Sequence, residues 1–574
     1  MKKKIQIKTK IEKGKQNHLS PPTMATIPAP PVINRLVLLY DKPKYYHTIM
    51  LLKELRELKN NYITVIEIDT IDKFLTETTI SSVKFDHLHM CVEFNPEFEA
   101  NLQKFITFLK NNPKMIDDVG DIAYHIHFEP GKKWKEYTQG QVAKYKDFLD
   151  VLRDAGADKV AHCSVVNKYD MDTVYITEKD DLAKLGSEIQ LDIQYWKNLK
   201  TLDYGESSIR FLPGVKLPEH LEVLNIGGGY ALETLTGFKM PPKLRALLAG
   251  QGAMPSIDEI VFPPTLQRLE IPENKIYFLE NVKFPSSLKD LDISQNRIES
   301  LRDVRFPQGL QSLNMGLNPV ENLRGIKFPE TLQFLDASNL PNESMTGVKF
   351  PELLEVLNLQ SSMTNTRGLK LPQRIKTLIL SGNGVNSINP LKLPSTIEVL
   401  YLNQNHIKTL NKVNFPPKLR ELYLGDNLIT TLKNVLFPQT IEVLDLENDP
   451  WSFENDKQIT TLKDVILPPN LKIFKLGYHG IKTIESFEFP ASLRYLSLAY
   501  NELRVIRNIK FGNHLKTLDL SGNPDLLSLD NVVIPESVTE LRVSSQLIPN
   551  LPGYLIERAN ESRLIIKKTA PQPE

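Results

Sequence analysis

The chain is poor in cysteine, and this scarcity limits the class of protein it belongs to. Only Cys91 and Cys163 occur among its 574 residues. Two cysteines cannot supply the disulfide framework on which small secreted domains depend. We therefore expect an intracellular, cytoplasmic protein that works in a reducing compartment.

Long apolar runs are missing as well. No stretch approaches the roughly 18 to 20 apolar residues that a membrane-spanning helix needs. The N-terminus, MKKKIQIKTKIEKGKQ, is basic, but no apolar segment follows it as in a secretory signal. The sequence therefore predicts neither a membrane span nor a membrane partner.

The chain also lacks a strong net charge and the common catalytic motifs. Its formal net charge is +1, which gives no overall reason to expect a nucleic-acid partner. No Gly-rich phosphate loop and no G-x-S-x-G nucleophile elbow is present. We predict no catalytic residue, no cofactor and no metal site.

What the chain has is a repeat that runs from Trp196 to Leu551. Its period of about 22 residues is typical of a solenoid, in which each unit buries its apolar face against its neighbours. Most units open with a Phe-Pro or Leu-Pro pair, and the unit that opens at Pro438 is longer than the others. The opening positions are Pro218, Pro241, Pro263, Pro285, Pro307, Pro329, Pro351, Pro372, Pro394, Pro416, Pro438, Pro468, Pro490, Gly512 and Pro535.

One unit shows how the repeat predicts structure. After Pro416, the Leu422-x-Leu424 step has period two and predicts a short strand with both leucines inward. The later apolar positions have period three, which favours a 3₁₀ or irregular segment. An asparagine after the strand, Asn427 here, can satisfy buried backbone groups. This asparagine ladder is expected to be imperfect where other residues replace it, at Gly229, Gly252, Ser362, Asp449 and His479.

The unit pattern L-x-x-L-x-L-x-x-N-x-I/L resembles the leucine-rich repeat family. The short unit and its F/L-P-x-x-L opening are similar to repeats of intracellular, bacterial-effector, amoebal and giant-virus proteins. The resemblance implies a curved solenoid with a parallel sheet on its concave face and a 3₁₀ or irregular convex side. It also implies a protein that binds other proteins.

Four regions follow from these patterns, and the fold class is α/β. We predict a basic, Pro-rich arm over 1–32, an α/β domain over 33–195, a solenoid of about 15 to 16 units over 196–551, and a cap and tail over 552–574. The α/β domain is predicted from alternating segments, with strands around RLVLLYD, YITVIEID, HLHMCVEF, AYHIHFEP and KVAHCSVV and helices near 45–60, 97–111 and 140–155 between them.

The candidate binding surface lies at the outward positions of each strand, five, seven and nine places after each opening proline. Sheet faces exposed to solvent are normally polar, so apolar and aromatic residues at these positions indicate a protein-binding site. The alternative is that valine and tyrosine only suit a strand. The predicted site comprises Phe334, Val399, Tyr401, Glu421, Tyr423, Val443, Asp445 and Tyr495, together with Trp451 from the insertion in the long unit. Few basic residues share this face, so we predict no nucleic acid on the solenoid.

Two alternative functions remain open. The first is a substrate adaptor in ubiquitin transfer, although no convincing recruiting domain precedes Trp196. The second is an enzyme whose site lies on the N-terminal strands, where His87 and His89 alternate on one strand and His125 and His127 on another. Alternating histidines can bind a metal or act as an acid–base pair if their strands are neighbours.

Overall fold

The computed structural model describes the chain in segments. These are residues 63–67, 87–94, 121–128, 160–167, 200–203, 217–228, 232–341, 345–364, 366–449, 459–530 and 532–569, the first four as backbone only. The described residues belong to two compact units, 1–271 and 272–574.

In the described part of the first unit, eight parallel strands follow one another in chain order. The order is β1 (Ile63–Glu67), β2 (His87–Phe94), β3 (Asp121–Phe128), β4 (Val160–Asn167), β5 (Thr201–Asp203), β6 (Val223–Asn225), β7 (Ala246–Leu248) and β8 (Arg268–Glu270). The predicted strands HLHMCVEF, AYHIHFEP and KVAHCSVV correspond to β2, β3 and β4, and YITVIEID to β1. The segment RLVLLYD and the predicted helices of this region lie outside the described residues.

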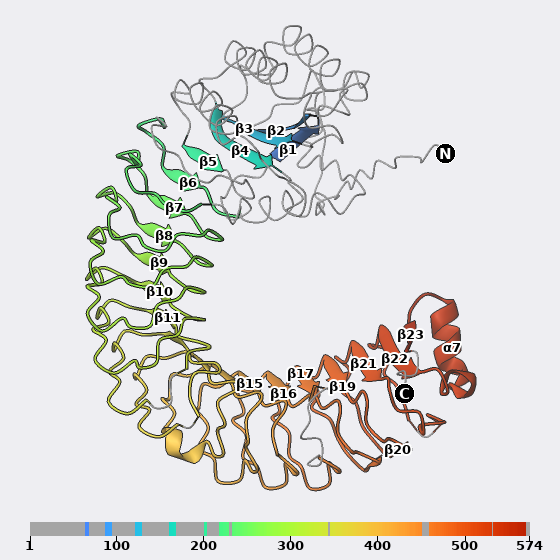
Figure 1. Ribbon diagram of the computed structural model, residues 1–574. Helices are drawn as coiled ribbons and strands as arrows, with labels where there is room; N and C mark the ends of the chain where they lie inside the picture. Colours follow the sequence, from blue (N-terminus) through green and yellow to red (C-terminus); the bar gives the residue numbers. More distant parts are fainter. Residues whose placement is uncertain are drawn as a thin grey trace, which may run out of the picture. The chain divides into compact units, whose positions relative to one another are not determined.

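The second unit continues the same architecture, with strands stacked side by side along the inner side of an arc of turns (Figure 1). The main sheet comprises β9 (Asp290–Asp292), β10 (Ser312–Asn314), β11 (Phe334–Asp336), β12 (Val356–Asn358), β13 (Thr377–Ile379), β14 (Val399–Tyr401), β15 (Glu421–Tyr423), β16 (Val443–Asp445), β17 (Ile473–Lys475), β19 (Tyr495–Ser497), β21 (Thr517–Leu520), β22 (Glu540–Ser544) and β23 (Ile565–Thr569). A smaller parallel sheet joins β18 (Thr483–Glu485) to β20 (Val505–Arg507).

Helical structure in the second unit is sparse, as expected for turns of this length. It consists, in the described residues, of the 3₁₀ helices η7 (Asn389–Leu391) and η8 (Ile548–Asn550) and the α-helix α7 (Gly553–Asn560). The predicted α/β class and the solenoid with a parallel sheet and an irregular outer side are confirmed. The predicted boundaries at 32, 195 and 551 stay predictions.

Each turn is held together by buried leucines at the predicted positions. In β15, Leu422 is fully buried between the half-buried Glu421 and Tyr423, and Leu424 is buried just beyond the strand. Neighbouring turns stack the same position in register, since Leu400 pairs with Leu422 and Leu422 with Leu444. The core is therefore a column of leucines that runs along the unit.

The asparagine ladder is built as the sequence predicts. The Asn427 carboxamide donates to the carbonyl oxygens of Leu402 and Leu424, at 2.8 Å each, and accepts from the amide of Ile407 at 3.0 Å. One side chain thus satisfies buried backbone groups of two successive turns. A backbone group buried without such a partner would cost free energy.

The predicted imperfection of this ladder is wrong at Ser362 and His479. Nε2 of His479 lies 2.9 Å from the carbonyl oxygen of Leu446, and its Nδ1 accepts from the amide of Ile459 at 3.3 Å. Ser362 donates its hydroxyl to the carbonyl of Ala337 at 2.6 Å. An imidazole has a nitrogen on each side of the ring, so it can replace both functions of a carboxamide.

The C-terminal segment closes the last turn. Strand β23 pairs in parallel with β22, with Ile565 opposite Glu540. Helix α7 buries Leu555 and Arg558, and the Arg558 guanidinium donates to the carbonyl oxygen of Val538 at 2.6 Å and to that of Ile534 at 3.4 Å. These carbonyls would otherwise face no following turn, so Arg558 takes over their hydrogen bonding.

Candidate functional site

The outward strand positions form two rows in register. One row runs Val399, Glu421, Val443, Ile473 and Tyr495 across β14 to β19. The other runs Ile379, Tyr401, Tyr423, Asp445 and Lys475. All of these side chains are half-buried except Asp445, which is buried. Parallel pairing without a register shift therefore brings the predicted residues of neighbouring turns together.

Tyr401 and Tyr423 form the centre of this face. Their rings stack with centroids 4.4 Å apart and planes inclined by 6°. The Tyr423 hydroxyl donates to the carboxylate of Glu421 at 2.8 Å. Burial raises the pKa of Tyr423, and the Glu421 carboxylate raises that pKa further. Tyr423 is therefore held neutral and in one orientation.

Sequence reasoning missed two apolar residues that complete this cluster, Ile379 and Ile473. They lie at the same offsets from their opening prolines as the predicted residues, and that offset could have found them. We call the cluster the strand patch. It comprises Ile379, Val399, Tyr401, Tyr423, Val443 and Ile473.

Phe334 lies three turns before Val399 on the same row. Val356 and Thr377 occupy the two turns between them, so apolar and small side chains connect Phe334 to the strand patch. Trp451, with most of its insertion, lies outside the described residues. Its predicted role stays untested.

Asp445 is not available to contact a partner freely, because it already has partners within the protein. It is only 8% exposed, accepts from the amide of Glu447 at 3.0 Å and accepts from Lys475 at 2.8 Å. Burial lowers the pKa of Lys475, but the hydrogen bond and charge of Asp445, together with the charges of Glu447 and Tyr495, leave that pKa raised. Asp445 therefore fixes the end of β16 and the ammonium of Lys475 beside the patch.

Tyr495 and Glu447 lie at the far edge of the same face. Burial raises the pKa of the Tyr495 phenol, and the charge of Asp519 adds to this effect. Burial also raises the pKa of the Glu447 carboxyl, followed by the charge of Asp445. Carboxylates and phenols thus share a region of restricted hydration.

The acidic residues Asp292 and Asp336, on β9 and β11, already have hydrogen-bond partners within the protein. Asp292 accepts from the amide and hydroxyl of Ser294 at 2.9 and 2.6 Å, and Asn314 donates to it at 3.0 Å. Asp336 does the same with Ser338, and Asn358 donates to Asp336 at 2.8 Å. These side chains cap the ends of their own strands.

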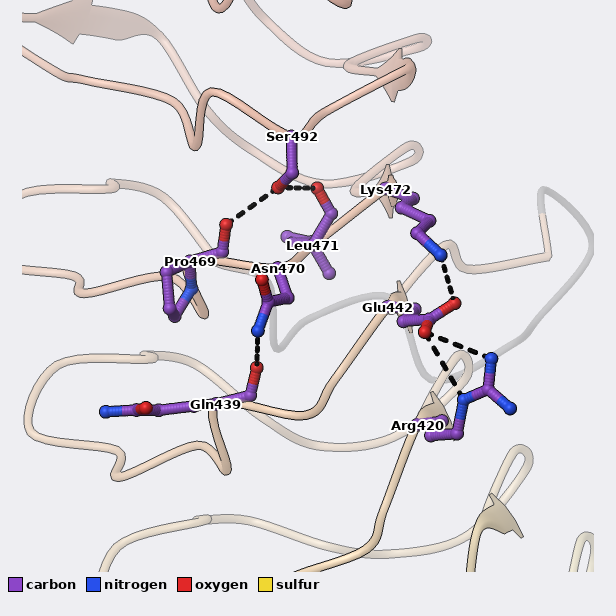
Figure 2. Close-up of polar contacts among 8 residues, drawn as sticks. All are labelled: Arg420, Gln439, Glu442, Pro469, Asn470, Leu471, Lys472 and Ser492. Atoms are coloured by element: carbon purple, nitrogen blue, oxygen red, sulfur yellow. Dashed lines mark hydrogen bonds and ion pairs between the residues drawn. The ribbon is translucent and has the colours of Figure 1, made fainter.

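A row of alternating charge borders the strand patch, one residue before each strand. Over six successive turns it reads Glu355, Lys376, Glu398, Arg420, Glu442 and Lys472. Glu442 bridges two cations, with Arg420 at 3.0 Å and Lys472 at 2.6 Å (Figure 2). The hydrogen bond from Lys472, aided by Arg420, lowers the pKa of Glu442. We call this row the charged border.

Hydroxyl and amide side chains tie adjacent turns together next to this border. Ser492 donates to the carbonyl oxygens of Pro469 and Leu471 at 2.7 and 2.8 Å, and Asn470 donates to that of Gln439 at 2.9 Å (Figure 2). Thr440 makes the equivalent bond to Leu419. These bonds keep the starts of the strands in register.

The histidine-bearing strands of the first unit are neighbours, as the enzymatic alternative requires. Cys91 pairs in register with His125, and His125 with Ser164, while His89 and His162 both pair with Ala123. The side chains of His87, His89, His125 and His127 lie outside the described residues. Within the part whose side chains are described, no group of three or more His, Cys, Asp or Glu could hold a metal ion.

Among the described residues, none of the helices has the length and apolar character to cross a bilayer.

Comparisons with known proteins agree with this architecture. A family model for the BspA-type leucine-rich repeat region matches residues 253–370 and 430–545 in six copies. No curated protein matches the sequence.

Three solved structures illustrate the similarity. YopM from Yersinia enterocolitica is 20% identical, with 72% of this chain and 87% of that chain covered and a TM-score of 0.44. A leucine-rich-repeat protein from Leptospira interrogans is also 20% identical, with coverages of 65% and 97% and a TM-score of 0.45. A circular leucine-rich-repeat protein, CroV588, is 16% identical, with coverages of 84% and 66% and a TM-score of 0.48. The residues that match the family model, 253–370 and 430–545, carry the short parallel strands described above, so this part of the chain is similar to BspA-type leucine-rich repeats in both sequence and fold.

Proposed function

We propose that this chain is a non-enzymatic interaction protein that binds a protein partner through the strand patch. The observation that carries the proposal is the stacked pair Tyr401–Tyr423 inside a cluster of half-buried aliphatic residues. Tyrosines that are already stacked lose little conformational freedom on binding. Aromatic anchors of this kind account for a large share of the free energy at protein interfaces.

The surroundings of the strand patch support a protein partner in particular. The charged border supplies a polar rim, in which Glu442 already forms ion pairs with Arg420 and Lys472. An apolar centre with a polar rim is the usual anatomy of a protein interface. In this proposal Glu421 orients Tyr423, Asp445 positions Lys475, and Phe334, Trp451 and Tyr495 contribute contacts at the periphery.

The test is capture of a partner by the intact chain and by the variant Tyr401→Ala/Tyr423→Ala. Proteins cross-linked to the intact chain in a lysate of the source cell would be identified, purified and titrated directly. Loss of two central aromatic anchors is expected to weaken direct binding by about ten-fold or more. Circular dichroism of both proteins would verify that the fold is intact.

A matched control is available in the same unit. Tyr478 and Tyr500 form a second stacked pair, 4.5 Å apart and inclined by 5°, that lies outside the strand patch. Tyr478→Ala/Tyr500→Ala should retain binding. Equal binding by the strand-patch variant, or equal loss in both variants, would contradict the proposal.

A further inference from the structure

One position of the repeat, two places before the opening proline, carries a single sign of charge over six successive turns. These residues are Lys283, Arg305, Lys327, Lys349, Lys370 and Lys392, and all six are exposed. Around Arg305, the adjacent Val304 and Phe306 are buried, so the alternation of the extended segment directs the arginine outward. We call these six residues the basic row.

The basic row contrasts with the charged border of the same unit. The charged border alternates in sign and forms ion pairs, such as Lys376 with Glu355 at 2.8 Å. No residue of the basic row forms an ion pair with any residue that the structure describes. Like charges on turns about 4.8 Å apart repel one another. Charges alternate in sign along the charged border, whereas the basic row is positive throughout. This difference indicates that the basic row has a ligand of opposite charge.

The segments that carry the basic row concentrate further positive charge. The six segments that run from 279, 301, 323, 345, 366 and 388 to the next opening proline contain nine basic residues against two acidic ones, Glu280 and Asp303. The additional cations include Arg302 and Arg324, which lie against the next turns at Gly325 and Gly347. Both glycines have a positive φ, of 88° and 82°. This local excess of positive charge is not apparent from the net charge of the whole chain, which is +1.

After the basic row ends, the same repeat position is aliphatic in three of the six later turns and reads Asn414, Leu436, Ile466, Glu488, Lys510 and Val533. Leu436, Ile466 and Val533 occupy it in later turns and are 83%, 78% and 79% exposed. No other large hydrophobic residue described in the second unit is as exposed as these three. Leu436 and Ile466 belong to adjacent turns, and Leu436 lies two turns beyond Lys392.

We propose that this side of the solenoid binds an anionic membrane surface. The basic row would contact acidic lipid headgroups, and Leu436 and Ile466 would enter the boundary between headgroups and acyl chains. Clustered basic residues combined with protruding aliphatic side chains are typical of interfacial membrane binding. A nucleic acid offers phosphates but no apolar phase for exposed aliphatic residues, so it explains only half of the arrangement.

This inference departs from the sequence-based expectation of no membrane partner. That expectation depended on the absence of a spanning segment, whereas binding at the surface requires none. The site is also separate from the strand patch, because it uses a different position of each turn. The two surfaces can therefore be tested independently.

The test is co-sedimentation of the full chain with vesicles of phosphatidylcholine alone and with vesicles that also contain phosphatidylserine, both at about 0.1 M salt. The intact chain should sediment with the anionic vesicles only. Lys327→Glu/Lys349→Glu/Lys370→Glu should lower the apparent affinity by about ten-fold or more, because each basic residue near the surface adds to the attraction. Leu436→Ser/Ile466→Ser should lower it at unchanged charge.

A control with the same change in net charge is Lys289→Glu/Lys408→Glu/Lys418→Glu, whose lysines are exposed but lie off the basic row. It should bind within about two-fold of the intact chain, since its charges occupy other positions of the repeat than the proposed contact. Failure of the intact chain to sediment, or equal weakening by the control, would overturn the proposal. Binding to single-stranded or duplex nucleic acid without vesicle binding, lost in the basic-row variant, would replace the membrane by a nucleic acid.

Discussion

At the scale of single residues, the repeat tolerates any side chain that satisfies the same backbone groups. Asn427 does this with a carboxamide, Ser362 with a hydroxyl and His479 with an imidazole. The requirement is a buried side chain that bonds a carbonyl oxygen of the preceding turn and accepts from a backbone amide of that turn, and all three residues meet it. His479 differs from the other two in one respect, because it can take up a proton.

Protonation of His479 should make the solenoid sensitive to acid. Burial lowers the pKa of His479 from 6.5 to about 4. The unfolded chain therefore binds this proton as pH falls through 6.5, before the folded chain does. The stability that neutral His479 contributes is complete above pH 6.5 and is lost between pH 6.5 and 4. A depression of this size corresponds to roughly 3 kcal/mol.

The substitution His479→Asn should remove this acid-sensitive part of the stability. Asparagine restores the usual ladder residue, so the thermal midpoint at pH 8 should change little. The drop in midpoint between pH 8 and pH 4.5 should become smaller than in the intact chain. His406→Asn serves as a control, because His406 lies outside the ladder position. An identical pH dependence in the His479 variant and the intact chain would refute the assignment.

At the scale of elements, the C-terminal cap depends on one buried cation. Arg558 is 5% exposed and donates to backbone carbonyls of the last turn, at Ile534, Glu536 and Val538. A buried guanidinium is stabilised only while its hydrogen bonds are complete. The helix, the last opening segment and the final strands are thus coupled through a single side chain.

Replacing Arg558 by leucine should loosen this cap. The carbonyls would lose their donors, and the expected cost is roughly 2 to 4 kcal/mol, because hydrogen bonds to a charged group are lost at several acceptors. Amide exchange should accelerate in β22, β23 and α7 and stay unchanged in β14 to β16. Arg563→Leu is the control, since Arg563 is exposed and contacts Glu561. Unchanged exchange in the cap would contradict this role.

The solenoid could be predicted from the sequence because each repeat of about 22 residues forms one turn. Leu422, Leu424 and Asn427 recur at fixed offsets, and each offset corresponds to one direction of the side chain within a turn. The same offsets located Tyr401 and Tyr423 in adjacent turns. Their stacking could not be predicted, because it depends on rotamers that the period does not determine.

Strand pairings that do not follow the repeat of about 22 residues were harder to predict. The pairing of β4 with β5 joins the N-terminal strands to the first repeats, and nothing in the sequence indicates that pairing. Strand β23 follows β22 in register although the spacing from Glu540 to Ile565 is longer than the repeat. The basic row was periodic and visible in the sequence, yet only the structure shows that its residues are exposed and unpaired among the described residues.

At the scale of the whole molecule, a solenoid has no single centre that holds all turns together. Strand β15 pairs with β14 and β16 alone, so most of its stabilisation comes from two neighbours. The free energy of such a chain is approximately a sum of terms for each turn and each interface between turns. Damage to one turn should therefore act locally, in contrast to a globular domain.

Leu422→Ala tests this locality. Leu422 is fully buried, so the cavity should cost roughly 3 kcal/mol. Amide exchange should accelerate in β14, β15 and β16, fade over the following turns and leave β21 and β22 as protected as before. Leu436→Ala removes a leucine that is 83% exposed and should alter exchange nowhere in the described solenoid. An equal loss of protection in every strand of the second unit would mean that its turns unfold as one cooperative body, and the nearest-neighbour description would then be wrong.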